Sequence, residues 1–131
     1  MILVDSSVWI DYFNGNQTSQ TDWLDSSLGN TPIVIGNLIL TEVLQGFQNE
    51  KDFKIARDLL LRIPYMSMGE QTLALDSAIN YRLLRKKGVT VRKTIDVIIG
   101  TFCIQNQLTL LHCDRDFDPM VNFLGLKIIN I

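Results

Sequence analysis

Five acidic residues stand beside strongly apolar segments of this chain, where a carboxylate is costly unless it has a partner. Asp5 follows the run MILV, and Asp114 and Asp116 stand just beyond the run LTLL. Glu42 lies within NLILTEVLQGF and Asp96 within TIDVIIGTFC. Each acid alone has an ordinary explanation as a helix cap, a helix-dipole partner, a solvated helix residue or a turn residue. Together they predict one shared acidic site.

Carboxylates gathered at one site limit the chemistry that the site can perform. Two of them about 4 Å apart repel by roughly 4 kcal/mol at an effective dielectric constant of about 20, so a cluster must protonate, separate or bind a cation. Oxygen ligands select Mg²⁺ or Mn²⁺, and the chain has one histidine and no His/Cys pattern with zinc spacing. An ion held this way favours hydrolysis of a phosphodiester bond, because it orients water and neutralises developing charge.

Short apolar runs alternate with helical patterns along the chain. The expected strands are 2–4, 33–35, 108–111 and 126–131. The expected helices are 6–13, 21–28, 38–47, 51–62, 69–87, 95–106 and a short one that starts at Asp118-Pro119. Ser6 or Ser7 is expected to cap the first of these helices, and Thr94 the helix that carries Asp96.

This alternation is typical of an α/β domain with a central, mostly parallel sheet of about four to five short strands and helices on both faces. Functional groups of such sheets collect at the carboxyl ends of the strands. Asp5 and Asp114 are therefore expected at one edge, and Glu42, on the helix after the second strand, is expected to face Asp5. The helix that carries Asp96 follows no strand directly, so the pattern places it less firmly.

Length and composition indicate one globular domain over residues 1–131. The net charge of -2 gives no overall basic signal for nucleic acid. The two cysteines form no CxxC pair, which favours reduced thiols in a cytoplasmic protein. The start MILVD resembles no signal peptide, and no run of about 18 apolar residues predicts a membrane span.

Basic residues concentrate in one segment. Six of the 12 lysines and arginines lie within a dozen positions: Arg82, Arg85, Lys86, Lys87, Arg92 and Lys93. Next to an acidic ion site, such residues could hold an RNA backbone. The alternatives are a solvated face, or pairing of Arg85 or Arg92 with an acid.

The chain resembles the PIN-domain family, specifically VapC-type toxins of bacterial toxin–antitoxin pairs. The matching segments are MILVDSSVWIDYF, LTEVLQGF, LRKKGVTVRKTIDVIIGTFC and LTLLHCDRDFD, in the expected order. The resemblance implies a Mg²⁺-dependent endoribonuclease, with Mn²⁺ as an alternative ion. It assigns the four principal catalytic and metal-binding acids to Asp5, Glu42, Asp96 and Asp114, and an auxiliary metal-binding acid to Asp116.

The resemblance also suggests substrate contacts and partners. Arg85, Arg92, Lys93, Ser7 and His112 are the expected substrate-side residues, although His112 fits a structural or substrate-edge role better than that of a general base. A VapB-type antitoxin is expected to cover surplus apolar side chains, for which core packing is the alternative, and a homodimer is common in such toxins. Those side chains are Trp9, Tyr12, Phe13, Leu38, Leu40, Val43, Leu44 and Phe47.

Three other functions are weaker hypotheses. A PIN-like domain could bind RNA without cutting it. A receiver-like signalling domain would need a lysine near residues 108–114, and none is present. A small phosphate-ester hydrolase with a DxD pattern would need an acid where Ser7 stands.

Overall fold

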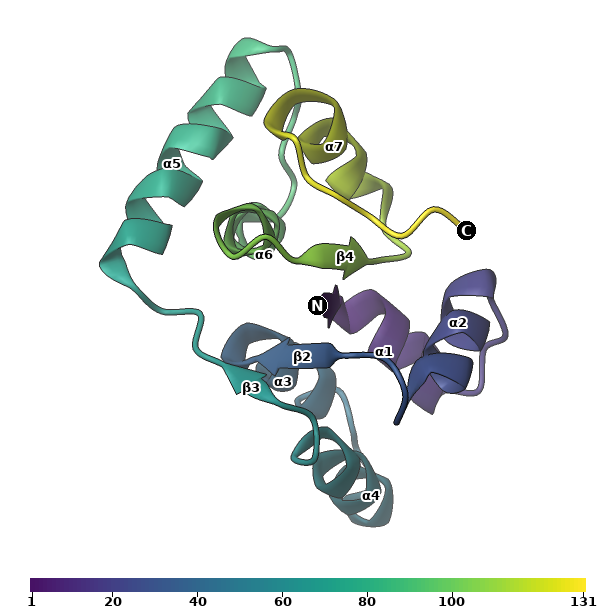
Figure 1. Ribbon diagram of the computed structural model, residues 1–131. Helices are drawn as coiled ribbons and strands as arrows, with labels where there is room; N and C mark the ends of the chain where they lie inside the picture. Colours follow the sequence, from purple (N-terminus) through teal and green to yellow (C-terminus); the bar gives the residue numbers. More distant parts are fainter.

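A four-stranded parallel sheet in the order β3-β2-β1-β4 runs through the computed structural model, which describes residues 1–131 (Figure 1). Its strands are β1 (Ile2–Val4), β2 (Ile33–Gly36), β3 (Tyr65–Met66) and β4 (Thr109–Leu111). In β1, Leu3 pairs with Val34 of β2 and with Leu110 of β4. The central strands are buried because their apolar side chains face helices on both sides.

The helices form two groups, and each helix contacts mainly other helices of its own group. The first comprises α1 (Ser6–Phe13), α2 (Ser19–Ser27), α3 (Asn37–Leu44) and α4 (Glu50–Leu60), and the second α5 (Gln71–Lys86), α6 (Thr94–Gln105) and α7 (Asp118–Leu124). Figure 1 shows the second group gathered on the β4 side of the sheet. From β1 the chain moves to β2 and β3 in one direction across the sheet, and then returns in the other direction to β4. Because parallel strands are joined by right-handed crossovers, this change of direction places the two groups of helices on opposite faces of the sheet. The predicted parallel α/β fold with helices on both faces is confirmed.

The edges of the sheet differ from the sequence prediction. The two-residue strand β3 was not predicted, because Tyr65 is exposed and follows Pro64 without an apolar run. The predicted strand 126–131 is wrong, because only Ile128 forms a bridge, to Leu110. Both backbone hydrogen bonds between this segment and β4 involve Leu110, so a longer ladder does not form.

Two predicted helix caps are also wrong. Asp5, rather than Ser6 or Ser7, caps α1, because its backbone is extended and its side chain accepts a hydrogen bond from the Ser7 N–H. Lys93, rather than Thr94, is the cap residue of α6, and its side chain makes no capping bond. Both differences move a charged residue to the start of a helix.

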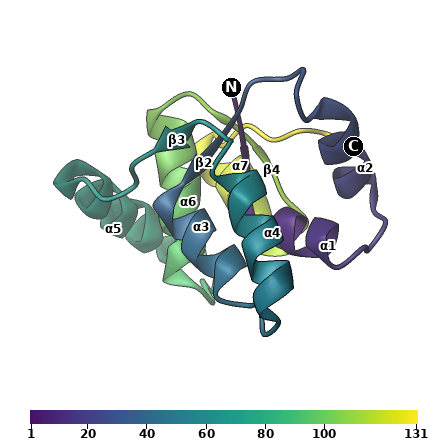
Figure 2. The same ribbon diagram turned by 90° about the horizontal axis from the view of Figure 1, so that it is seen from below.

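A continuous core connects the sheet to both helix groups. It includes Leu3, Ile35 and Leu110 of the strands, Trp9 of α1 and Val97 of α6. Figure 2 shows α3 and α4 in front of the sheet and α5 projecting at the left edge of the molecule. Both cysteines are free, as predicted. None of the helices has the length and apolar character needed to cross a membrane.

Candidate active site

The carboxyl ends of β1 and β4 bring the first and last acids to the same edge of the sheet. The two strands are paired neighbours, and the Asp5 N–H donates to the Leu111 carbonyl at 2.9 Å. Ser7 joins the two ends a second time: its Oγ donates to Asp5 Oδ2 at 2.5 Å and accepts from the Cys113 N–H at 3.2 Å. Asp5 is therefore fixed beside the segment that leads to Asp114.

Asp5 is buried, with 3% of its surface exposed. Oδ2 is occupied by the backbone and hydroxyl of Ser7, but the buried Oδ1 has no hydrogen-bond partner. Burial raises the pKa of the Asp5 carboxyl, and the hydrogen bonds from Ser7 oppose this shift only in part. A buried carboxylate oxygen without a hydrogen-bond partner destabilises the fold, and a bound cation would remove that free-energy cost.

Glu42 approaches the same place from the first group of helices. It lies in α3, which begins directly after β2, and its Oε1 accepts a hydrogen bond from Ser6 Oγ at 2.9 Å. Burial raises the pKa of Glu42, the Ser6 bond lowers it, and the charge of Asp5 raises it further. The carboxylates of Glu42 and Asp5 are thus close enough to repel, as predicted for acids that face each other.

Three further acids come from α6 and from the turn after β4. One carboxylate oxygen from each of Asp96, Asp114 and Asp116 lies within 4.8 Å of the others. Asp96 is in the first turn of α6, Asp114 precedes the 3₁₀ turn Arg115–Phe117, and Asp116 lies within that turn. We call the whole set, together with Asp5 and Glu42, the acid cluster.

Asp96 is the most strongly perturbed member of the acid cluster. It is 4% exposed, and its buried Oδ2 accepts no hydrogen bond. Burial raises its pKa to about 6, against the effect of Lys93, and repulsion from Asp5, Asp114 and Glu42 adds to the rise. These interactions join the acids of both helix groups into one electrostatic unit.

Asp114 shows the opposite shift. Burial by itself would raise its pKa, but the hydrogen bond from the Asp116 N–H, 2.9 Å from Oδ1, and the charges of Lys93 and Arg92 hold the pKa below its ordinary value. Asp114 therefore ionises more easily than Asp96.

Two adjacent basic residues pair with the trio of acids formed by Asp96, Asp114 and Asp116. Arg92 donates from Nε and Nη2 to Asp116 Oδ1 at 3.3 and 2.8 Å. Lys93 Nζ lies 3.4 Å from Asp114 Oδ2 and 3.8 Å from Asp96 Oδ2. The hypothesis that Arg92 has an acidic partner is confirmed, whereas Arg85 contacts none of these acids and lies over the Tyr81 ring.

His112 has structural contacts. Its Nδ1 accepts a hydrogen bond from the Asp114 N–H at 3.1 Å, and its ring packs against Phe117 at 5.0 Å between centroids. Burial lowers its pKa despite the nearby acids. Nδ1 of His112 is thus engaged by the backbone of Asp114, and the ring is held against Phe117.

The fold brings together all five acids predicted from the sequence, and with them Ser7, Arg92, Lys93 and His112. Two contacts were not predicted in this form. The bond from Ser6 to Glu42 needs the spatial approach of α1 and α3, and the sequence signal was only a serine next to Asp5. The contact of Lys93 with two acids could have been anticipated in part from its i,i+3 spacing to Asp96.

The acid cluster has the properties of a site for a hard metal ion. All of its candidate ligands are carboxylate oxygens, and two buried ones, Asp5 Oδ1 and Asp96 Oδ2, lack any hydrogen-bond partner. Oxygen donors of this kind suit Mg²⁺, Mn²⁺ or Ca²⁺ rather than zinc. The residues present therefore fit a divalent cation.

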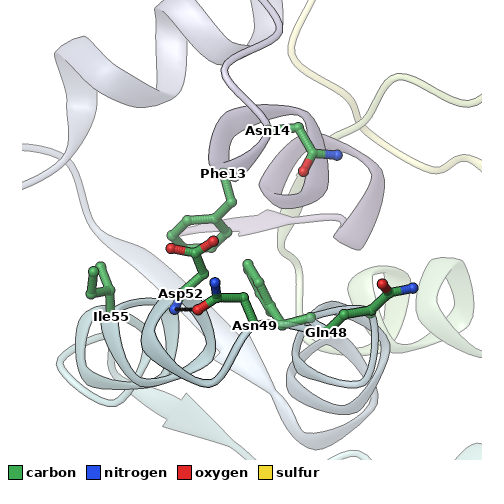
Figure 3. Close-up of a pocket in the computed structure, with 8 residues that line it drawn as sticks. Phe13, Asn14, Gln48, Asn49, Asp52 and Ile55 are labelled. Carbon is green, nitrogen blue, oxygen red and sulfur yellow. Dashed lines mark hydrogen bonds between the residues drawn. The ribbon is translucent and has the colours of Figure 1, made fainter.

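A groove with both apolar and polar side chains lies apart from the acid cluster, on the first group of helices. Its larger pocket, of about 390 Å³, is formed by the end of α1, the α3–α4 connection and the start of α4 (Figure 3). Phe13 points from α1 towards Asp52 and Ile55 of α4, and Phe47 packs on Phe13 at 5.7 Å between centroids. An adjoining pocket of about 100 Å³ adds Ile10 and Val43. We call this surface the α1–α4 groove.

Core packing explains part of the apolar surplus noted in the sequence. Trp9 and Val43 are almost fully buried, so they mainly stabilise the core. Tyr12, Phe13, Leu38, Leu40, Leu44 and Phe47 are partly exposed at its margin. Of the surplus side chains, these six leave apolar surface available to a partner, beside the exposed Ile10 and Ile55 of the groove.

Comparison with known proteins assigns the family. The sequence model of the PIN domain matches residues 2–121, and the chain belongs to the PIN domain family. This assignment favours the PIN-like interpretation of the sequence over the receiver-like one.

Among curated proteins, the chain is similar to the VapC ribonuclease Mb1587 of Mycobacterium bovis and to ribonuclease VapC11 of Mycobacterium tuberculosis. Both are 26% identical over 129 residues, which cover 97% of this chain and 96% of each relative.

Solved structures share the fold. VapBC2 of Rickettsia felis, bound to a DNA fragment from its promoter, aligns with a TM-score of 0.78 at 18% identity, over 100% of this chain and 99% of that one. A toxin–antitoxin complex of Klebsiella pneumoniae aligns with a TM-score of 0.70 at 18% identity, over 99% and 97% of the two chains. VapC20 of Mycobacterium tuberculosis, a toxin that cleaves the sarcin–ricin loop, aligns with a TM-score of 0.70 at 16% identity, over 97% and 99%.

Proposed function

We propose that this protein is a Mg²⁺-dependent endoribonuclease toxin of a VapBC-type module, which hydrolyses RNA phosphodiester bonds and is inhibited by a cognate antitoxin. One observation carries the proposal: five acids from four separate segments of the chain interact at one sheet edge, and two of their buried oxygens have no hydrogen-bond partner. The similarity to proteins named VapC ribonucleases supports the same activity.

The acid cluster would hold the ion. Asp96, Asp114 and Asp116 have oxygens close enough to share one cation, and the orphan Oδ1 of Asp5 supports a role for Asp5 as a further ligand. Oxygen ligands and a phosphate substrate favour Mg²⁺, with Mn²⁺ as the alternative. A bound divalent ion supplies positive charge that acidifies a water molecule and offsets charge on the phosphate.

The other residues of the chain orient the acids and the substrate. Ser7 fixes Asp5, Ser6 fixes Glu42, and His112 fixes the backbone of Asp114. Glu42 lies beside Asp5 and has a raised pKa because of burial, so it would hold a proton more readily than an exposed glutamate and is a candidate for proton transfer. The basic segment would hold substrate RNA through its phosphates. Arg85 contacts no acid of the cluster, and Arg92 and Lys93 lie next to the cluster.

The α1–α4 groove is the proposed antitoxin site. Its partly exposed apolar side chains suit the nonpolar face of a helix laid into a groove. The Klebsiella pneumoniae toxin–antitoxin complex of the same fold supports a partner of this kind.

The domain and assembly predictions extend this proposal. Residues 1–131 form one PIN domain, which is supported by a core that runs from Leu3 to Leu126. A homodimer is supported by Leu75, Ile79 and Leu83, which recur every four residues on α5 and are exposed.

The test is RNA cleavage by the purified protein with Mg²⁺ and with a chelator. Wild-type protein is expected to cut RNA only with the ion, whereas Asp5→Asn and Asp96→Asn should lose about 10²-fold or more, because ion ligands contribute several kcal/mol to catalysis. Asp58→Asn removes an exposed carboxylate on α4 and should cut normally. Binding of RNA without cleavage by the wild-type protein would instead support a non-cutting PIN-like domain, and equal cleavage by all variants would refute the assignment of the acids.

A further inference from the structure

Lys93 occupies an unusual position for a basic residue. It is the cap residue at the start of α6, where the helix dipole disfavours a positive charge. Its ammonium group nevertheless turns towards the acid cluster, 3.4 Å from Asp114 Oδ2 and 3.8 Å from Asp96 Oδ2. The acids, rather than the helix, therefore determine where this side chain lies.

The oxygens that Lys93 approaches are also available to another cation. Asp114 Oδ1 already accepts the Asp116 N–H, whereas Asp114 Oδ2 accepts no backbone N–H and Asp96 Oδ2 has no hydrogen-bond partner. Asp96 raises the pKa of Lys93 most, and Asp114 and Glu42 raise it further, so the ammonium responds to three acids. A divalent ion bound by the same oxygens would meet a positive charge at contact distance.

Arg92 does not compete in the same way. Both of its contacting nitrogens donate to a single oxygen, Asp116 Oδ1, and its side chain is more exposed than that of Lys93. Lys93 alone bridges two members of the trio. With 54% of its side chain exposed, Lys93 also has room to withdraw into solvent.

We infer that Lys93 is the resident counter-ion of the acid cluster, and that its ammonium must leave Asp96 and Asp114 before a divalent cation binds. The inference rests on the proposed metal site and adds a determinant of its affinity. Lys93 stabilises the metal-free cluster by compensating buried negative charge, and for the same reason it weakens ion binding. The site then fills at a higher ion concentration than the carboxylates alone would require.

Equilibrium binding of Mn²⁺ to the full-length chain, followed by calorimetry or by the electron paramagnetic resonance signal of free Mn²⁺, tests this inference. Lys93→Met removes the charge and keeps most of the side-chain length. We expect it to bind Mn²⁺ about tenfold more tightly than wild type, which corresponds to about 1.4 kcal/mol. Lys54→Met, at an exposed position of α4 outside the basic segment, is the matched control and should leave the affinity unchanged.

Thermal unfolding gives a second readout that does not depend on activity. In chelator, Lys93→Met should unfold at a lower temperature than wild type, because three acids lose their compensating charge. Saturating Mn²⁺ should then raise its Tm by more than it raises that of wild type. A purely structural lysine would lower Tm equally with and without the ion.

The outcomes separate this inference from the proposed function. If wild type binds Mn²⁺, loses that binding in Asp96→Asn and cleaves RNA, while Lys93→Met has unchanged or weaker affinity, the role of Lys93 is overturned and the proposed function stands. If neither wild type nor Lys93→Met binds Mn²⁺, the metal site and the role of Lys93 are both overturned.

Discussion

The ionised Asp96 carboxylate should destabilise the metal-free protein, and Asp96→Asn should remove that cost. Burial raises the pKa of Asp96 from 3.8 to about 6. Between these two values the folded state binds more protons than the unfolded state, so folding stability falls as pH rises through this window. The loss levels off about one pH unit above the folded-state pKa and does not grow further.

The size of the effect follows from the shift. A pKa rise of about two units corresponds to about 3 kcal/mol, of which roughly half develops above pH 5. Asparagine has a similar shape and no charge, so the advantage of Asp96→Asn over wild type should grow by about 1 to 2 kcal/mol between pH 5 and pH 8. Asp58→Asn, which removes an exposed carboxylate, should show no such growth.

Urea unfolding of both variants and wild type in chelator, at pH 5 and pH 8, measures this difference. The chelator matters because a bound ion would stabilise the ionised wild type and reverse the order. If the advantage of Asp96→Asn is the same at both pH values, or if the variant is the less stable protein at pH 8, then ionisation of the buried Asp96 carboxyl does not destabilise the fold.

Three further predictions concern other parts of the molecule. Ser7→Ala should cost about 1–3 kcal/mol of stability in thermal unfolding, because it removes the 2.5 Å bond to Asp5 and leaves the Cys113 N–H unpaired; a loss no larger than that of Ser26→Ala would contradict the role of Ser7. Ile10→Asp places a charge in the α1–α4 groove, where Ile10 is 40% exposed, and should weaken antitoxin binding at least about tenfold in calorimetry while RNA cleavage continues. Ile79→Asp on α5 should convert a dimer into a monomer in light scattering, and an unchanged mass would remove α5 from the interface.

Much of the fold could be predicted because its elements carry strong local signals. The runs ILV and LTLL are apolar enough to identify buried strands, and Asp118-Pro119 marks the start of α7. The two-residue β3 and the single bridge of Ile128 carry almost no local signal. Their pairing depends on which neighbouring backbone groups lie within reach, and that is a property of the folded chain.

The site shows the same division. The sequence by itself predicted which five carboxylates form the acid cluster, because acids next to buried segments are costly unless they are paired or bind a cation. It also determined that Asp5 and Asp114 share an edge, because parallel strands align their carboxyl ends.

Only the tertiary structure decided how these groups interact. Asp96 lies next to Asp114 and Asp116 because α6 packs against the turn after β4. The ammonium group of Lys93 lies beside Asp96 and Asp114. Orphan oxygens, paired cations and shifted pKa values depend on distance and burial. Those quantities arise when segments far apart in the chain pack together, and no local pattern of residues encodes them.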